Sequence, residues 1–235
     1  MNTTRKFALG MCLAIANLAW AESGWETVSQ ARNRGEVSSY VREVPGHDVK
    51  SFKGVVEAPY PMTAILAVLA DIDNLPSWVF QCERARHDSS WPDVVYYMEF
   101  HTPWPVNNRE AVLRNTAVQD PQTLTVTINT VAVPGYVGAS RGRVRVPELN
   151  NRFIIEPLKD GGTRVSFETL VDPGGAIPAW MSNWIATSAP RDTLRALLKQ
   201  AALPKYRDRR VEAVHLPGLP GLQAPVASER HTAAD

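Results

Sequence analysis

The chain has few of the residue patterns that carry enzyme chemistry. Its 235 residues include two cysteines and five histidines, and none of the histidines stands at a metal-ligand spacing. The sequence contains no Gly-x-Ser-x-Gly elbow, no phosphate-binding glycine loop and no dinucleotide fingerprint. We therefore expect a protein that is not an enzyme, with no metal site and no cofactor.

A strong charge of one sign is also missing. Lys and Arg together number 25 against 24 Asp and Glu, which gives a formal net charge of +1. Without residues 1–21, which hold the basic residues Arg5 and Lys6, 23 basic residues face 24 acidic ones. This balance argues against a nucleic acid as a partner, and against an anionic membrane as an electrostatic partner.

Cysteine is too scarce for a disulfide scaffold. Beyond residue 21 the chain keeps only Cys82, so no intramolecular disulfide forms even in an oxidising compartment. We interpret Cys82, which lies between apolar Phe80 and the charged region at Glu83, as a small core residue rather than a nucleophile.

The one long hydrophobic run stands at the N-terminus. Residues 7–18 are mostly apolar, they follow Arg5 and Lys6, and Ala19-Trp20-Ala21 supplies a small-x-small cleavage site. The run is shorter than the roughly 20 residues that span a bilayer. We predict a signal peptide over residues 1–21 and export to the periplasm or the medium; an uncleaved anchor is the alternative.

Residues 24–203 have the size of one domain, which we expect to be a monomer. From Pro204 onward Pro and Gly recur without a sustained apolar period. This composition predicts a flexible tail over residues 204–235.

Most of the domain consists of short segments separated by turn-forming clusters, a pattern typical of antiparallel strands. Residues 123–130 alternate between hydroxyl-bearing and apolar side chains, so the hydroxyls face either water, which we favour, or a polar-lined cavity. A short amphipathic helix is expected over residues 62–72. The expected strands are residues 25–30, 37–44, 49–58, 81–87, 94–100, 109–119, 123–131, 141–146, 152–157 and 163–171.

A long helix is expected after the turn cluster at residues 172–175, with Pro178 in its first turn. Pro190 is expected to kink or break it. Because the helix carries two tryptophans and a methionine, it needs a concave apolar partner, and a curved sheet is the one that the chain offers. We interpret its first half as a lid over a cavity; the alternative is a structural helix that closes a filled core. Its apolar positions, at helical spacing, are Ile177, Trp180, Met181, Trp184, Ile185, Leu194, Leu197, Leu198 and Ala201.

Two segments, in this order, resemble the START (steroidogenic acute regulatory protein-related lipid transfer) domain. Residues 96–110 join a strand to a Pro-Trp-Pro loop and an Arg-acid pair, and residues 172–180 lead into the last helix. Asp73, shortly before Trp78, is also similar to that family. The resemblance covers residues 25–203, and it departs from the family in having Glu110 where Asp is usual.

This resemblance implies an α+β helix-grip fold, in which a curved antiparallel sheet wraps around the long C-terminal helix. It also implies a tunnel that holds one lipid, sterol or isoprenoid-like molecule without a cofactor, with transfer of that ligand between membranes as an extension of binding. The loop at residues 102–108 would cover the tunnel mouth. The alternatives are a cyclase or hydrolase of the same superfamily that acts on an apolar substrate, and an interaction module with a filled core.

Trp104 stands between two prolines and forms a rigid apolar tip, suited to cover a cavity or to touch a membrane transiently. Its alternative role is packing against Trp180 or Trp184. Arg109 and Glu110 point to opposite faces of a regular strand, and we predict a structural ion pair here, with Arg109 as a buried member in preference to a ligand contact.

The candidate ligand-binding residues lie on the loop, on a central strand and on the lid helix. Asn183 is included because a buried amide without a partner is costly and a ligand oxygen would satisfy it; a bond to nearby backbone is the alternative. The full predicted set is Trp104, Asn115, Trp180, Asn183 and Trp184.

Overall fold

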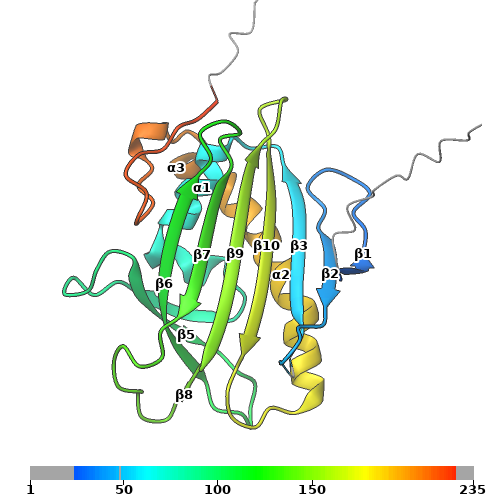
Figure 1. Cartoon of the computed structure of the whole chain (residues 1–235), viewed down its shortest axis with the longest axis vertical. Coiled ribbons are helices and arrows are strands. Elements are labelled where there is room, and N and C mark those ends of the chain that lie inside the picture. Colours follow the sequence, from blue (N-terminus) through cyan, green and yellow to red (C-terminus); the bar gives the residue numbers. More distant parts are fainter. Residues whose placement is uncertain (1–23, 48, 226–235) are drawn as a thin grey trace, which may run out of the picture.

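The computed structural model describes residues 24–47 and 49–225. Its strands form one sheet in the order β1-β2-β3-β10-β9-β7-β6-β5-β4, with β8 beside β6. The three α-helices lie on one side of this sheet, and α2 crosses it diagonally (Figure 1). The strands are β1 (Glu26–Ser29), β2 (Ser38–Arg42), β3 (Ser51–Ala58), β4 (Cys82–Arg86), β5 (Val95–Phe100), β6 (Arg109–Gln119), β7 (Val126–Ala132), β8 (Val144–Arg145), β9 (Glu148–Pro157) and β10 (Thr163–Asp172).

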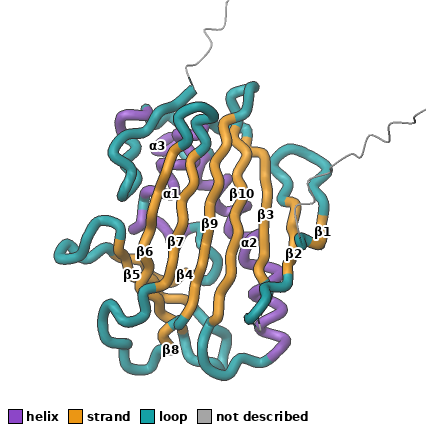
Figure 2. The backbone as a smooth tube through the Cα atoms, viewed as in Figure 1, coloured by secondary structure: helices purple, strands orange, loops and turns teal. Residues whose placement is uncertain are grey.

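The pairing is antiparallel along the whole strand order, and only the two-residue β8 runs parallel to its partner β6. Figure 2 shows the long central strands side by side with the helices behind them. The predicted α+β helix-grip fold is confirmed. Each of the ten predicted strands is present: β6 has the predicted bounds and the others have shifted ends, with β9 beginning four residues earlier than expected and β8 shorter than the expected strand.

Helix α2 (Ala179–Ala201) packs its second half tightly onto β3. Leu194 and Leu197 are fully buried there. A Cβ built on Gly54 of β3 would lie 2.7 Å from Leu194 Cδ1, so this approach of helix to strand requires a glycine. Of the kink or break expected at Pro190, the break is wrong: the helix continues through this residue, which is buried and lies against Gly54.

Helix α1 (Met62–Ala70) closes the upper end of the sheet in Figure 1. Its apolar residues belong to the same core cluster as α2, and Ile65, Leu66 and Val68 are fully buried. The 3₁₀ turn η1 (Ile72–Ser77) follows and leads to Trp78, which is 4% exposed. This segment brings aromatic side chains from the helix side towards the sheet.

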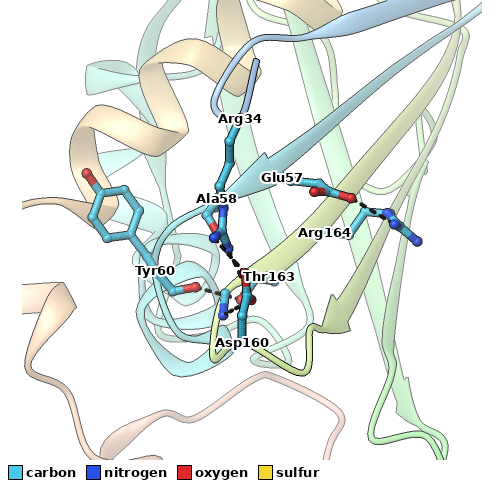
Figure 3. A network of polar contacts seen from close by, with 8 residues as sticks. Arg34, Glu57, Ala58, Tyr60, Asp160, Thr163 and Arg164 are labelled. Carbon is cyan, nitrogen blue, oxygen red and sulfur yellow. Dashed lines mark hydrogen bonds and ion pairs between the residues drawn. The ribbon is translucent and has the colours of Figure 1, made fainter. Parts of the chain in front are cut away.

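The β9–β10 hairpin is tied at its tip to the two neighbouring connections. The Arg34 guanidinium donates to Asp160 Oδ2 at 2.7 Å and to the Ala58 carbonyl at 3.0 Å, as Figure 3 shows. Thr163 Oγ1 donates to the Tyr60 carbonyl at 2.8 Å. The hairpin tip needs glycine at position 162, because a Cβ there would lie 2.6 Å from the Ala58 carbonyl oxygen.

The flexible tail predicted from residue 204 is wrong as far as residue 225. Helix α3 (Pro204–Arg207) places Tyr206 in the core, where it is 1% exposed and its hydroxyl donates to Asp71 Oδ2 at 2.6 Å. The turn η2 (Val211–Ala213) follows, and Val214 and Leu216 are buried in the same cluster. A few anchoring side chains therefore hold a segment whose composition resembles that of a tail. The predicted signal peptide and residues 226–235 lie outside the described residues.

Candidate functional site

A cavity of about 180 Å³ lies between the inner face of the sheet and α2. Its wall is mostly apolar, and within residues 24–47 and 49–225 neither a carboxylate nor a lysine contributes to it. Two side chains with basic nitrogen groups, His101 and Arg109, also line it. The main apolar contributors are Leu69, Leu75, Trp78, Phe80, Met98, Leu113, Ile128, Leu149, Phe153, Phe167, Val171, Trp184 and Ile185.

Strand register arranges the inner side chains of the sheet in transverse rows. One row is apolar: Ile128 of β7 lies opposite Phe153 of β9, which lies opposite Phe167 of β10. The Phe153 and Phe167 rings stack with centroids 4.4 Å apart. A second apolar row, nearer the other end of the strands, holds Leu113 of β6 together with Leu149 and Val171.

Between these two rows runs a polar one. Asn115 of β6 lies opposite Thr130 of β7, Thr130 lies opposite Asn151 of β9, and Asn151 lies opposite Thr169 of β10. The Thr130 hydroxyl donates to Asn115 Oδ1 at 2.6 Å, and the Thr169 hydroxyl donates to Asn151 Oδ1, also at 2.6 Å. We call these four residues the polar row.

Tyr96 of β5 extends the polar row at the side of Asn115. Its hydroxyl donates to Asn115 Oδ1 at 3.3 Å. Burial raises the pKa of Tyr96 well above its usual value, and this effect exceeds the opposite effect of its hydrogen bonds to Thr130 and Asn115. Tyr96 is therefore a neutral hydrogen-bonding group at neutral pH.

Helix α2 supplies the opposite wall of the cavity. Ile185, Ala189 and Thr193 recur every four residues and so share one face of the helix. Trp184 lies beside them, with its ring 5.1 Å from that of Phe80. The Thr193 hydroxyl accepts a hydrogen bond from the Phe80 backbone N–H at 3.1 Å, which fixes the helix to the segment after η1.

Arg109, the first residue of β6, lines both the cavity and a depression on the neighbouring surface. We call this side of the cavity its mouth. Arg109 Nη2 donates to the Gly174 carbonyl at 3.0 Å, and its Nη1 donates to the Asn107 carbonyl. Its Nε lies 3.4 Å from the Pro173 carbonyl, to which it also donates. Arg109 thus joins the loop before β6 to the turn before α2, and burial lowers its pKa.

The predicted ion pair of Arg109 and Glu110 is wrong. The two side chains do point to opposite faces, but Arg145 of β8 is the cation that binds Glu110, with Nη2 2.9 Å from Oε1. Among the described residues Arg109 binds backbone carbonyls and no carboxylate. The signal for the true partner was absent from the sequence, because Arg145 reaches Glu110 through the short parallel pairing of β8 with β6.

Glu110 is fully buried on the outer face of the sheet, away from the cavity. Tyr97 Oη donates to its Oε2 at 2.6 Å, and the Ser140 backbone N–H donates to its Oε1 at 2.7 Å. Burial alone would raise the pKa of Glu110, but the hydrogen bonds from Ser140, Tyr97 and Arg145 together lower it to about 2. This cluster fixes the loop before β8 and takes no part in lining the cavity.

Two predicted site residues lie on the surface beside the mouth. The Trp104 side chain is 90% exposed and the Trp180 side chain is 57% exposed. Neither lines the cavity, and the exposure of Trp104 argues against its alternative role of packing against Trp180 or Trp184. A shallow depression lies near them, lined by residues 105–107 of the loop and 175–178 of the turn before α2.

Asn115 and Trp184 line the cavity as expected, and their role in ligand binding stays a prediction. The Asn183 side chain lies outside the part of the chain that the structure describes. The sequence reasoning missed Thr130, Asn151 and Thr169. Their signal was present: Thr130 continues the apolar face of Val126 and Ile128, and Thr169 stands between Phe167 and Val171 in an alternating strand.

Nothing in residues 24–47 and 49–225 gathers three or more His, Cys, Asp or Glu side chains into a possible metal site. Burial raises the pKa of Cys82 to about 12, so its thiol stays protonated at neutral pH. Within the described residues, a ligand would therefore be bound through hydrogen bonds and apolar contacts.

Comparison with known proteins places these features in a family. The model of the START domain matches residues 10–202. A STAR-related lipid transfer protein of Xanthomonas axonopodis has a similar solved structure, with a TM-score of 0.68 and 27% identity over 77% of this chain and 99% of that one.

Two relatives extend the comparison in sequence. An uncharacterised protein of Pseudomonas aeruginosa is 29% identical over 172 residues, or 73% of this chain and 85% of the relative. The phosphatidylcholine transfer protein of Rattus norvegicus is 28% identical over 150 residues, which cover 62% of this chain and 69% of the rat protein.

Proposed function

The chain belongs to the START domain family, and on this basis we propose that it binds one hydrophobic molecule, a lipid or sterol, between the sheet and α2. The observation that carries the proposal is the mostly apolar cavity between the sheet and α2, crossed by the row of Asn115, Thr130, Asn151 and Thr169. Transfer of apolar surface from water into such a cavity contributes about 25 cal/mol per Å². The lipid-transfer names of the Xanthomonas and rat relatives support the same class of ligand.

The bound state has a wider cavity than this conformation. A volume of about 180 Å³ lies below the range of roughly 300–1,000 Å³ typical of sites for drug-sized ligands. The elements that would open are the loop at residues 102–108 and the start of α2, because both border the mouth and are joined there through Arg109. The packed second half of α2, held by Gly54 and Leu194, would stay in place.

Transfer between membranes is the second part of the proposal. Trp104 and Trp180 expose large amphipathic rings beside the mouth, and tryptophan is favoured at membrane interfaces. A lipid would then leave or enter through a mouth that touches the bilayer. No helix among the described residues has the length and apolarity needed to cross a membrane.

We also propose export to the periplasm or the medium, which the apolar N-terminal run and its cleavage site support. Binding without catalysis is the favoured activity. The finding that supports it is a wall, over residues 24–47 and 49–225, without a carboxylate to act as general acid or base, while Nδ1 of its histidine, His101, lies 3.2 Å from Glu83 Oε1. A turnover enzyme and an interaction module with a filled core remain the competing functions, and the cavity argues against the second.

Native mass spectrometry tests this proposal. The protein is purified from the exported fraction of its own host, and any bound molecule is extracted and identified. A stoichiometric adduct with the mass of a lipid or sterol is the expected result. A bare protein mass that persists after incubation with host lipid extract would contradict the proposal.

A further inference from the structure

The polar row interrupts a wall that is otherwise apolar. On one side of it lie Ile128 and Phe153, and on the other lie Leu113 and Leu149. Asn115, Thr130 and Thr169 are each at most 9% exposed. A polar row in this position lowers the apolar burial of the core, so a purely structural wall would not need it.

The hydrogen bonds within the row are incomplete. In each Asn–Thr pair the threonine hydroxyl donates to the amide oxygen. Neither Asn115 Nδ2 nor Asn151 Nδ2 donates to any residue that the structure describes. Both amide nitrogens can therefore donate to a ligand oxygen in the cavity.

The spacing of these two donors fits a ligand with more than one oxygen. Asn115 on β6 and Asn151 on β9 are separated by β7, so their strands lie about 10 Å apart. Thr130 stands between them on β7 and Tyr96 beside them on β5. The polar part of a lipid that carries several oxygens, such as a glycerol head group with its ester, offers acceptors to both donors, whereas a terminal methyl group offers none.

The charges around the cavity exclude a strongly ionic head group from this position. Among the residues that the structure describes, Arg109 has the one guanidinium on the wall; it lies at the mouth and donates through Nε, Nη1 and Nη2 to three carbonyls. A phosphate at the polar row would be buried without a counter-charge, which is far more costly than a buried neutral group.

We propose that Asn115, Thr130, Asn151 and Thr169 bind the carbonyl and hydroxyl oxygens of an uncharged lipid, in preference to a phospholipid. This inference rests on the proposed binding function and names its ligand class. The polar part of the ligand lies against the middle of the sheet, and its apolar part lies along the two flanking rows and the Trp184 face of α2.

The test compares monooleoylglycerol with a lysophosphatidylcholine that carries the same acyl chain, through displacement of the uncharged dye Nile red. The full-length protein is compared with Asn115→Leu and Asn151→Leu. The matched control is Asn129→Leu, because Asn129 lies on the outer face of β7 and accepts a hydrogen bond from Arg152 there. Thermal unfolding verifies that each variant is folded.

The proposal expects tighter binding of monooleoylglycerol than of lysophosphatidylcholine. Each inner variant should bind monooleoylglycerol about tenfold more weakly, the effect of one lost hydrogen bond, with Nile red affinity unchanged. Equal affinities in the inner variants and the control, or a preference for lysophosphatidylcholine, would overturn it.

Failure of the row is distinguishable from failure of lipid binding. If the inner variants bind Nile red and lipids with unchanged affinity, lipid binding stands and the role of the polar row is contradicted. If the wild-type protein binds neither lipid nor the dye, both are contradicted. If the leucine variants do not fold, Thr130→Val is compared with Thr127→Val on the outer face of β7, and weaker binding is expected only for the first.

Discussion

Arg109 Nη2 donates to the Gly174 carbonyl at 3.0 Å and so joins the start of β6 to the turn that precedes α2. The same guanidinium also binds the Asn107 carbonyl of the neighbouring loop. The two segments that border the cavity mouth are therefore held by one side chain. We call this side chain the latch. Its removal should let the loop before β6 and the turn before α2 separate more easily, without altering the polar row.

Arg109→Met should weaken this latch. Because the substitution removes three charge-assisted hydrogen bonds, we expect a loss of about 2 kcal/mol or more in the free energy of unfolding. Hydrogen exchange at the amides of residues 174–177 should accelerate, and bound lipid should dissociate faster. Arg114→Met, at an exposed position of the same strand, is the control and should change neither quantity. Equal exchange rates in the two variants would show that Arg109 does not hold the mouth.

Glu110 should make stability depend on acid. Its folded-state pKa of about 2 lies below the ordinary value of 4.5, so its contribution is complete above the unfolded pKa and disappears as the pH falls towards 2. Chemical unfolding between pH 6 and pH 2 should show this loss, and Glu110→Gln should flatten that part of the profile.

Arg145 carries the other half of this cluster. Arg145→Met leaves Glu110 as a buried charge with fewer partners, and we expect a cost of about 3–5 kcal/mol at neutral pH. Arg164→Met, which breaks a half-exposed pair with Glu57, should cost less than about 1 kcal/mol. A similar small effect for both variants in urea unfolding would contradict the assigned role of the Glu110 cluster.

Gly54 sets the distance between α2 and the sheet. Gly54→Val forces the Leu194 side chain or the helix to move, so we expect destabilisation by about 1–3 kcal/mol in urea unfolding. Gly135→Ala is the control, since a Cβ there meets no atom within 4 Å. A stable Gly54→Val variant with unchanged lipid binding would show that this close approach is not needed.

The periodicity of the sequence predicted the strands well because one face of each strand packs against the core. In β7, for example, Val126 and Ile128 are buried while Thr127 between them is less so. The same rule predicted that Arg109 and Glu110 face opposite ways. It did not identify their partners, because these lie 35 and 65 residues further along the chain and depend on how β8 and the turn before α2 fold back.

The segment after Pro204 shows a different limit. Its buried core residues are Tyr206, Val214 and Leu216, with the partly buried Leu219 and Leu222 packed against the same cluster, and the spacing of these residues is uneven. Composition alone therefore indicated a tail. The polar row was hidden for a related reason: each strand contributes one polar residue to an apolar face, and only the register across four strands brings them together.

The exposed tryptophans should act in membrane contact and not in holding the ligand. Trp104→Ala and Trp180→Ala should slow the transfer of a fluorescent lipid between vesicles several-fold, while equilibrium binding stays unchanged, because neither side chain lines the cavity. Trp184→Ala is the contrasting variant and should weaken binding itself. Equal transfer rates for the wild type and both surface variants would contradict the proposed contact.

A crystal structure of the protein loaded with the lipid identified from its own host tests the central claim most directly. The account predicts electron density for one ligand between the sheet and α2, in contact with Trp184, with the loop at residues 102–108 or the start of α2 displaced to make room. Density only on the outer surface, or a cavity filled by side chains in the loaded crystal, would contradict the claim that this cavity is the binding site.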